Sequence, residues 1–421
     1  MLTRDGSITD LFLELAAIPS PSGRERALAE QIRDWLSDNG VQARFDDAGA
    51  RNGSDAGNLI ARVPGAAAAP ILLFVAHMDT VESGEEPVRP ALGDDGVIRS
   101  AGATILGADN KSAVAATMRL CRSVLRLPVE RRPSVVVAFT CREESGRMGA
   151  SLLDLDSLEI DCAFSVDGSF PIGTVITRAL GQTTFEISVH GRAAHAAANP
   201  EAGINAIAVA GEIVAALPLG RRPGGGSVSI AAIIGGAVID RLGPGGSGGL
   251  GAPGASGAPG AVATAGDAVV RAALAATPTN SVPDVTYLRG EVRGYTVDEM
   301  QRTSEAIERI VAGVCVARGA RYEWARDCGR MVPPLPGAPD SRALSLVRAA
   351  AQAIDGVELT LQDGHATLEA NYFAATTDVV AVASGGQAPH QTSESISVTE
   401  LVALEALLTG IVACACACVA H

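Results

Sequence analysis

The chain of 421 residues carries 47 acidic side chains against 33 lysines and arginines, a formal net charge of −14 at pH 7. Hydrophobic residues make up 47% and aromatic residues 3%, which excludes a disordered chain and predicts an interior built from Ala, Val, Leu and Ile. The acidic balance argues against a nucleic-acid partner, because phosphate binding needs clustered lysine and arginine.

The first elements in chain order are expected to be helices. Apolar residues recur with helical spacing between positions 7 and 39, for example at Leu11, Leu15, Leu28 and Ile32. A polar, turn-rich stretch around 51–53 follows. Residues 1–5 lack the layout of a secretory signal, and no stretch is expected to reach the roughly 20 apolar residues of a membrane helix. A cytoplasmic protein with no membrane partner is therefore predicted.

Four apolar runs along the chain predict buried parallel strands. They are residues 71–76, 135–139, 163–166 and 379–383. Since helical segments alternate with the first three runs, we expect an α/β fold with a mixed, mostly parallel sheet flanked by helices.

The pattern changes between residues 182 and 332. Strands are predicted at 182–190, 227–234, 285–292 and 320–325, and helices at 205–217 and 298–317. The earlier pattern resumes at 333 with a helix at 341–354, and the last helix opens with a capping box of Ser397 and Glu400. A catalytic domain of 1–181 and 333–421 is thus predicted, with an inserted α+β lid or dimerisation domain at 182–332. The length suits two domains.

A run without charge, GPGGSGGLGAPGASGAPG at 243–260, interrupts the inserted domain. Its composition predicts a flexible loop. A substrate gate is an alternative, although long surface loops add little closure cost and need no function to persist.

Five residues of metal-binding type lie in short motifs spread over the chain: His77, Asp109, Glu144, Asp167 and His390. All but Asp109 follow the apolar runs. In an open α/β sheet, ligands bind beyond the carboxyl ends of the strands, so these side chains are expected to converge on one place.

Seven segments resemble, in order, the motifs of the di-zinc peptidase family that contains peptidase T, cytosolic dipeptidases, aminoacylases and carboxypeptidase G. They are HMDTV at 77–81, LGADNKSAVAA at 106–116, REESG at 142–146, SVDG at 165–168, HGRAAHAAANPEAGINAI at 190–207, TNSVPD at 279–284 and PHQTSE at 389–394. A single HxD is a weak signal, whereas this ordered set is specific. The resemblance covers nearly the whole chain, is strongest to peptidase T-like tripeptidases, and implies a zinc-exopeptidase-like catalytic domain.

The resemblance implies a pair of zinc ions, with cobalt or manganese as alternatives. Two cations about 3.5–4 Å apart need a shared anionic bridge, which a carboxylate with two oxygens supplies. Asp109 matches that bridge. His77 and Asp167 match the further ligands of one ion, and Glu144 and His390 those of the other. Each ion keeps a position for water or substrate.

Two neighbouring carboxylates complete the expected centre. Asp79, two residues past His77 in an extended segment, can accept a hydrogen bond from the imidazole and orient it. Glu143 matches the family's general base, which would take a proton from a metal-bridging water and return it to the leaving amine. The resemblance also implies a cis peptide bond between Asp109 and Asn110.

Three residues of the inserted domain match substrate-contacting positions. His195 would approach the substrate carbonyl as an electrophile, and Asn280 and Arg293 would hold the peptide backbone and its carboxylate, which suits the bidentate fork of arginine. There are two alternatives: His195 has no catalytic role, and Arg293 forms an ordinary surface salt bridge. The segment 368–371, LEAN, departs from the SDAN-like segment of peptidase T relatives and leaves substrate contacts from that loop open.

Three functions are therefore weighed. The first is a tripeptidase-like aminopeptidase that acts on short peptides, favoured because an Asp at position 167 is typical of the family's aminopeptidases and dipeptidases. The second is an amidohydrolase that removes the acyl group of N-acyl amino acids. The third is a catalytically silent binding or scaffold protein. The family also suggests a homodimer through the inserted domain.

Overall fold

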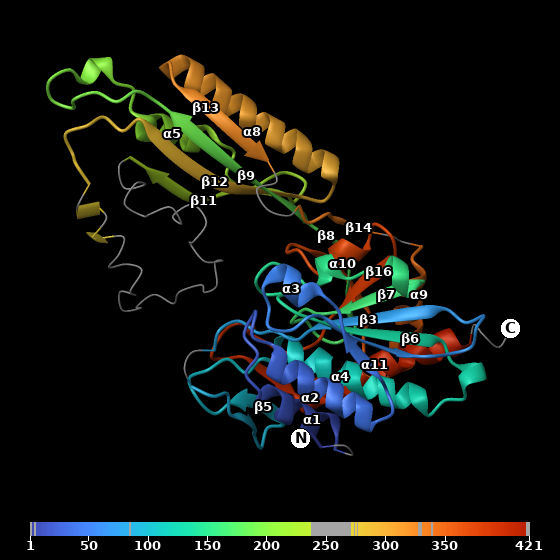
Figure 1. Ribbon diagram of the computed structural model, residues 1–421. Coiled ribbons are helices and arrows are strands. Elements are labelled where there is room, and N and C mark those ends of the chain that lie inside the picture. Colours follow the sequence, from blue (N-terminus) through green and yellow to red (C-terminus); the bar gives the residue numbers. More distant parts are fainter. Residues whose placement is uncertain are drawn as a thin grey trace. The chain divides into compact units, whose positions relative to one another are not determined.

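The computed structural model describes residues 2–3, 6–83, 86–236, 271–272, 274–275, 277–326, 331–337 and 340–417. The chain divides into two compact units (Figure 1). Unit 1 comprises Met1–Ala179, Leu335–Gly364 and Leu368–His421, and unit 2 comprises Leu180–Pro334 and His365–Thr367. Apart from its short second segment, unit 2 is therefore one insertion in the sequence of unit 1.

Unit 1 is built on a nine-stranded mixed sheet in the order β1-β2-β6-β3-β7-β16-β8-β14, with β15 also paired to β8. The four inner strands β6, β3, β7 and β16 run parallel. Strands β1, β2 and β14 pair with their neighbours in antiparallel fashion, and β8 is antiparallel to β16 and β14 but parallel to β15. The strands are β1 (Ala43–Phe45), β2 (Leu59–Val63), β3 (Ile71–His77), β6 (Ser134–Thr140), β7 (Cys162–Val166), β8 (Thr174–Ala179), β14 (Leu335–Pro336), β15 (Thr360–Gly364) and β16 (Asp378–Val382). All four predicted apolar runs are inner strands.

The inner strands bury both faces, which explains their unbroken apolar sequence. In β3, Leu72 and Phe74 belong to the core on one face, whereas Leu73 and Val75 belong to the core on the other. This alternation follows from the two-residue repeat of a strand.

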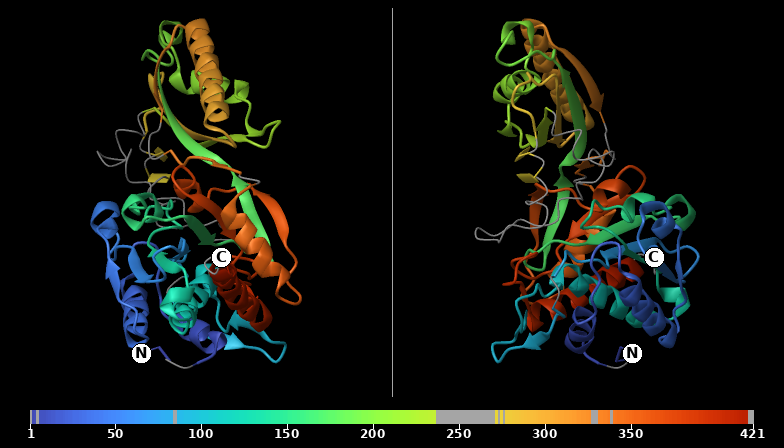
Figure 2. Two further views of the ribbon diagram at one scale, coloured as in Figure 1. Left: turned by 90° about the vertical axis from the view of Figure 1, so that its right-hand side faces the viewer. Right: turned by 60° about the vertical axis from the view of Figure 1, so that its left-hand side comes forward.

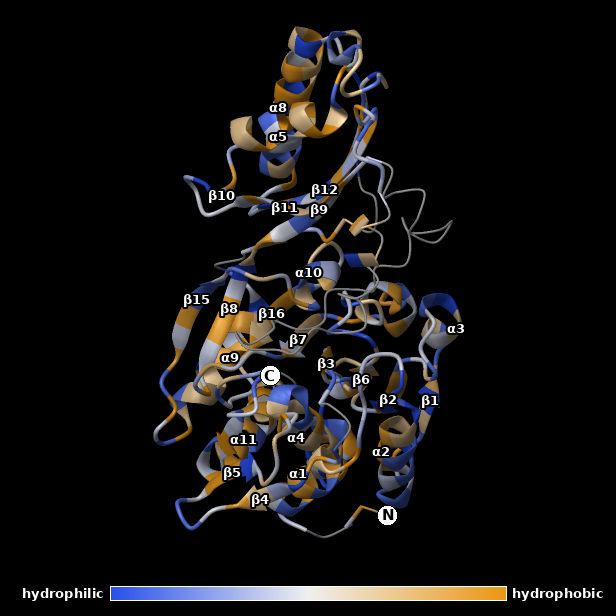
Figure 3. Ribbon diagram, turned by 90° about the vertical axis from the view of Figure 1, so that its left-hand side faces the viewer, coloured by the Kyte–Doolittle hydropathy of each residue, from blue (hydrophilic) through white to orange (hydrophobic). Residues whose placement is uncertain are grey.

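Helices cover the face that carries Phe74. They are α1 (Ile8–Ala16), α2 (Arg26–Asp38), α4 (Ala108–Leu125), α9 (Arg342–Gln352) and α11 (Val398–Ala417). Orange apolar segments recur along α1, α4 and α11 (Figure 3). The opposite face packs against the short helix α10 (Ala370–Phe373) and the loop helices η2 (Ala150–Leu152) and η3 (Asp156–Leu158).

Smaller elements complete unit 1. A three-stranded antiparallel sheet joins β4 (Pro90–Leu92), β5 (Val97–Ser100) and β17 (Ser395–Ser397). The remaining short helices are α3 (Ala48–Asn52) and η1 (Val129–Arg131). The predicted capping box at the start of α11 is present, since Ser397 and Glu400 exchange side-chain to main-chain hydrogen bonds of 3.1 Å.

Unit 2 is an antiparallel sheet in the order β10-β11-β12-β9-β13 with α5 and α8 packed on it (Figure 2). Its elements are β9 (Gly181–His190), η4 (Pro200–Ala202), α5 (Ala206–Ala216), β10 (Gly220–Arg221), β11 (Ser227–Gly235), β12 (Val285–Gly294), α8 (Val297–Arg318) and β13 (Arg321–Arg326). The four strands and two helices expected here are present, and β10 was not anticipated. The role of 182–332 as a lid or dimerisation domain stays a prediction, and the loop 243–260 lies outside the described residues.

Helix α11 departs from the expectation that no segment is apolar enough to cross a membrane. Its residues Val398–Cys416 pass that test by length and composition, with a mean hydropathy of 1.8. In the structure, however, Leu404, Leu408 and Ile411 are fully buried in the core that α1, α4 and α9 also line. The apolar character of α11 is therefore explained by packing inside unit 1.

This packing predicts opposite outcomes for two substitutions in α11. Leu408→Ala should lower the free energy of unfolding of unit 1 by about 2–5 kcal/mol, because it leaves a cavity at a fully buried position. Val402→Ala, at a side chain that is 53% exposed, should change it by at most about 0.5 kcal/mol. Urea unfolding of both variants measures the difference, and equal effects would contradict the placement of α11.

Candidate metal centre

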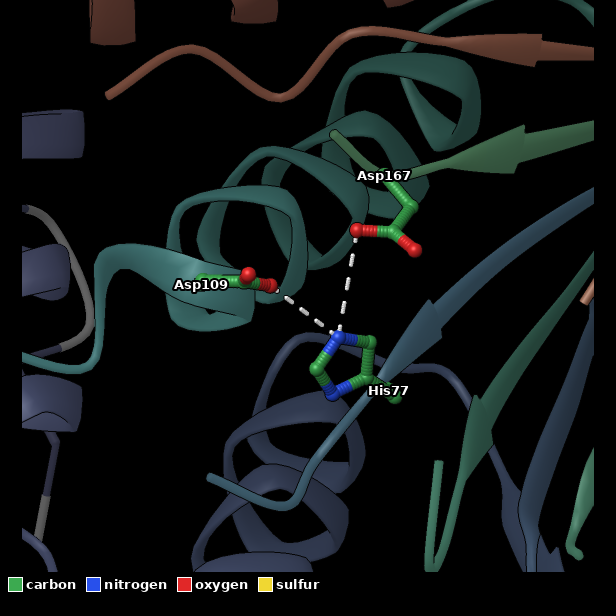
Figure 4. Close-up of side chains that lie close together, drawn as sticks. All are labelled: His77, Asp109 and Asp167. Carbon is green, nitrogen blue, oxygen red and sulfur yellow. Dashed lines mark hydrogen bonds and ion pairs between the residues drawn. The ribbon is translucent and has the colours of Figure 1, made fainter. Parts of the chain in front are cut away.

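The parallel strands deliver polar side chains to their common carboxyl edge. His77 is the last residue of β3, Asp167 directly follows β7, and Asp109 lies in the first turn of α4. Figure 4 shows these three side chains pointing toward one another. Glu144 follows β6 after a short loop, and His390 lies in the loop after β16. The five residues predicted as ligands thus come together from segments far apart in sequence.

Asp109 lies between two groups of donors. His77 Nε2 is 3.2 Å from Asp109 Oδ1 and 3.9 Å from Asp167 Oδ1. On the other side, His390 Nε2 is 3.6 Å from Asp109 Oδ2 and 2.8 Å from Glu144 Oε1. Each trio has its ligand atoms within 4.8 Å of one another, the separation expected around a single ion. The two oxygens of Asp109 therefore face different trios.

The donor set suits divalent cations of the zinc, cobalt and manganese type, because it combines imidazole nitrogens with carboxylate oxygens. The neighbouring thiol of Cys141 is not part of it. Cys141 is buried, its sulfur accepts a hydrogen bond of 3.4 Å from Asn52, and burial raises the pKa of its thiol to about 12. Ligation by a thiolate is not needed to complete either trio.

The electrostatics of the cluster also favour bound cations. Burial, reinforced by the charge of Asp109, raises the pKa of Asp167 to about 7. Burial likewise raises the pKa of Glu143 well above its usual range. Burial alone would lower the pKa of His77, but hydrogen bonding to Asp109 and the nearby carboxylates raise it well above normal. The crowded carboxylates thus favour protonation, which lowers the negative charge of the site. Divalent cations would neutralise that charge more fully.

Asp79 holds the loop that carries Glu143 and Glu144. Its carboxylate accepts the main-chain N–H of Glu143 at 2.8 Å and that of Glu144 at 3.0 Å, together with the hydroxyl of Ser22. The imidazole Nδ1 of His77 lies 2.9 Å from the carbonyl oxygen of Asp79 and 3.6 Å from its carboxylate. Asp79 therefore contacts His77 through both groups while its carboxylate organises the glutamate loop.

Glu143, the predicted general base, is nearly buried beside the cluster. Its carboxylate lies 3.6 Å from the guanidinium of Arg147 and within 4.8 Å of the donor atoms of His77 and Glu144. The cis peptide bond implied between Asp109 and Asn110 is present. The Glu143 carboxylate thus lies close both to the guanidinium of Arg147 and to the metal-binding side chains.

Three buried carboxylates next to the centre were not anticipated. Glu25 accepts the main-chain N–H of Arg142 at 2.9 Å, and Glu394 accepts three N–H groups, two from the loop before α4 and one from Asp109 in its first turn. Glu369, fully buried in the divergent segment 368–371, has no hydrogen bond of ordinary geometry to its carboxylate oxygens among the described residues. Burial raises its pKa to about 7. Glu394 is the last residue of the PHQTSE motif, and its acidic side chain near His390 was the signal that the sequence offered.

The residues predicted to contact substrate lie in unit 2, at two places. His195 forms an isolated bridge with Ser281, next to Asn280, whose carbonyl accepts the N–H of Ala196 at 2.8 Å. Arg293 pairs with Gln182 at the start of β9, eight residues before His190 at its end, a separation of about 26 Å at the usual rise of a strand. Its guanidinium contacts Glu291 at 2.7 Å. Arg293 is thus far from His195 within unit 2.

The fold and the side-chain cluster define a two-unit α/β protein with a candidate two-metal centre at the edge of its parallel strands. The chain belongs to Peptidase family M20/M25/M40, which it matches over residues 73–413. The family predicted from the ordered motifs is confirmed.

Individual relatives agree with this assignment. The chain is 32% identical over 220 residues to the protein YqjE of Bacillus subtilis (strain 168), covering 52% of this chain and 58% of that protein. It is 29% identical over 179 residues to peptidase T of Streptococcus equi subsp. equi (strain 4047), covering 36% and 44%. The matches thus span about half the length of these curated relatives.

A solved structure extends the likeness to the whole fold. The aminopeptidase PepT from Bacillus cereus ATCC 10987 matches with a TM-score of 0.80 and 25% identity, covering 97% of this chain and 98% of that chain. The predicted fold class, a mixed and mostly parallel sheet flanked by helices, is confirmed.

The raised pKa values predict how pH affects the stability of the metal-free protein. The pKa of Asp167 rises from 3.8 to about 7, and that of His390 from 6.5 to about 8 through its hydrogen bond with Glu144. The folded state then binds these protons more tightly than the unfolded chain, so their stabilisation is lost as pH rises through the folded pKa values. The pKa of Asp109 is lowered, so this residue changes the stability only in more acidic solution.

The melting temperature of chelator-stripped protein should therefore decrease as the pH is raised from about 5 to about 8. Saturation with zinc should flatten this dependence, because cations replace the protons. A stripped protein whose melting temperature stays constant or rises over this interval would contradict the charge balance described for the cluster.

Proposed function

We propose that the protein is a metal-dependent exopeptidase that hydrolyses an amide bond of short peptides, as a tripeptidase-like aminopeptidase with two zinc ions. The observation that carries the proposal is the pair of donor trios that share Asp109. Cobalt or manganese fits the same donors. Membership of a peptidase family and the likeness to peptidase T relatives support hydrolysis of peptides.

In this proposal the ligands are those predicted from the motifs. Asp109 would bridge the ions, His77 and Asp167 would complete one, and Glu144 and His390 the other. Cations bound there would polarise the scissile carbonyl and make a water molecule easier to deprotonate. Bound cations would relieve the repulsion among the carboxylates, which would account for so many acidic groups at one buried edge.

Glu143 would act as the general base. Its carboxylate takes a proton from the attacking water and delivers it to the amine that leaves as the C–N bond breaks. Burial suits this role, because it raises the pKa of Glu143 and so strengthens it as a base. Arg147, 3.6 Å away, provides a counter-charge that orients the carboxylate. Asp79 keeps the base in place through the main-chain N–H groups of its loop.

His195 is prepared to donate a hydrogen bond. Its Nδ1 accepts the N–H groups of Ala197 at 3.2 Å and of Ala198 at 3.1 Å, which leaves the ring proton of the neutral form on Nε2. The side chain is exposed, so Nε2 can reach a ligand. A donor of this kind would stabilise the negative charge that develops on the carbonyl oxygen. Asn280 lies beside it for contact with the peptide backbone.

The choice of amide depends on two further points. Asp167, rather than glutamate, favours aminopeptidase or dipeptidase activity over removal of an acyl group. Arg293 could bind the carboxylate of the substrate only by replacing or extending its ion pair with Glu291. Deacylation of N-acyl amino acids is the alternative of the same family. A cytoplasmic location and a homodimer through residues 182–332 stay predictions.

A substrate panel tests the proposal. Zinc-loaded protein should cleave tripeptides with a free amino terminus faster than dipeptides, and should leave N-acetyl amino acids intact. Mass spectrometry of the products identifies the bond that is cut. Turnover of acyl substrates alone would replace the aminopeptidase assignment with a deacylase, and metal uptake below two equivalents without hydrolysis would favour a silent binding protein.

Replacement of the general base provides a second test. Glu143→Gln should lower kcat by about 10²–10⁴-fold, because the amide cannot accept the proton, while metal content stays at the wild-type level. Glu358→Gln, at an exposed glutamate of the same unit, is the matched control and should retain full activity. If Glu143→Gln turns over peptides at the wild-type rate, Glu143 is not the base.

A further inference from the structure

We propose that Glu394 is a positioning residue that fixes Asp109 relative to the His390 loop, so that the cation between Asp109, Glu144 and His390 depends on it. The inference rests on the proposed metal centre. It assigns a task to a residue that is neither a ligand nor the base.

Glu394 binds the backbone that presents Asp109. Its Oε2 accepts the N–H groups of Leu106 at 2.8 Å and of Gly107 at 2.7 Å, and its Oε1 accepts the N–H of Asp109 at 3.0 Å. One carboxylate thus satisfies three main-chain donors within four consecutive residues. Hydrogen bonds to an ionised acceptor are about twice as strong as neutral ones, so this segment is held firmly.

The same residue closes the loop that carries His390. The N–H of Glu394 donates to the carbonyl of Gln391 at 3.0 Å. At the base of the loop, Gln387 and Ser395 exchange main-chain hydrogen bonds of 2.8 and 3.2 Å. His390 itself adopts a left-handed backbone with φ of 64°. Through Glu394 this tight loop is bonded directly to the segment that begins α4.

Burial makes the contact hard to replace. Glu394 is 2% exposed. The nearby Lys111, also 2% exposed, offers only a partial counter-charge, because burial lowers the pKa of its ammonium group to about 7. The ammonium of Lys111 donates to the carbonyl of Ile18 at 2.6 Å, which keeps it in place. In Glu394→Gln the side-chain amide would accept with one oxygen only, and its own N–H groups would face main-chain N–H donors. At least one of the three buried donors would then lose its partner.

The effect should fall on one cation more than on the other. His77 and Asp167 stand on β3 and directly after β7, where the parallel sheet fixes them. His390 instead belongs to a loop, and its side chain is 44% exposed, against 1% for His77. Its distance from Asp109 therefore depends on the loop contact that Glu394 makes. Loss of that contact weakens the trio of Asp109, Glu144 and His390 first.

Zinc titration of the metal-free protein against a competing chromophoric chelator tests this inference. Wild type should take up two equivalents. In Glu394→Gln one equivalent, that of the trio of Asp109, Glu144 and His390, should bind about 10–100-fold less tightly, the usual cost of removing a residue that orients a ligand, while the other changes much less. Glu394→Asp, which keeps the charge but shortens its reach, should be intermediate.

Asp378→Asn is the matched control. The Asp378 carboxylate accepts the Ser341 hydroxyl at 2.6 Å and the N–H of Ala343 at 3.1 Å, at the start of α9. It shares the chemistry of Glu394 but not its position. This variant should bind both zinc equivalents as wild type does. Metal-free Glu394→Gln should still unfold cooperatively, with a melting temperature lowered only by the loss of the buried hydrogen bond.

Two outcomes overturn the inference alone. One is wild-type affinity for both equivalents in Glu394→Gln, or in Glu394→Asp if the glutamine variant does not fold. The other is equal weakening of both equivalents with a melting temperature far below that of the control, which would reveal a general structural role. A wild-type protein that takes up fewer than two equivalents instead overturns the proposed function, and this inference with it.

Discussion

Mutual repulsion of carboxylates at one edge of a sheet is the constraint on which the centre depends. Asp79, Asp109, Glu143, Glu144 and Asp167 all gather there, mostly buried. Such a set is unstable in a low-dielectric interior unless opposite partial or full charges surround it. The protein supplies main-chain N–H groups from the loops between its strands and helices, and imidazoles from two more segments. The remaining excess of negative charge is what a pair of divalent cations would neutralise.

These N–H donors also define the geometry. Asp79 receives them from the loop after β6, and Glu394 from the loop before α4. Each carboxylate therefore joins two segments that the sheet alone would not hold together. The parallel strands place the candidate ligands at one edge of the sheet. The hydrogen bonds from main-chain N–H groups to Asp79 and Glu394 then hold the loops that carry Asp109, Glu144 and His390. The groups that shape the candidate site therefore also hold the surrounding loops.

The sequence predicted the parts of this arrangement that depend on local pattern. Unbroken apolar runs predicted β3, β6, β7 and β16. Because polar residues follow these runs, the sequence also predicted that four of them converge: His77, Glu144, Asp167 and His390. The N–H contacts of Glu394 were out of reach, because they join residues 285 or more positions apart and depend on main-chain groups common to every residue. The apolar composition of α11 is a property of its core position, which hydropathy alone does not distinguish from a lipid environment.

In unit 2, β11 and β12 are joined by the segment that contains residues 243–260, yet they meet in register, with Gly235 opposite Thr286. The N–H of Gly236 donates to the carbonyl of Val285 at 3.0 Å, so the two ends of that connection are already side by side. Because closing a longer connection between adjacent ends costs little free energy, its length can vary without moving either strand. The place where the chain is richest in glycine is therefore a practical position for grafting an epitope or a cleavable linker.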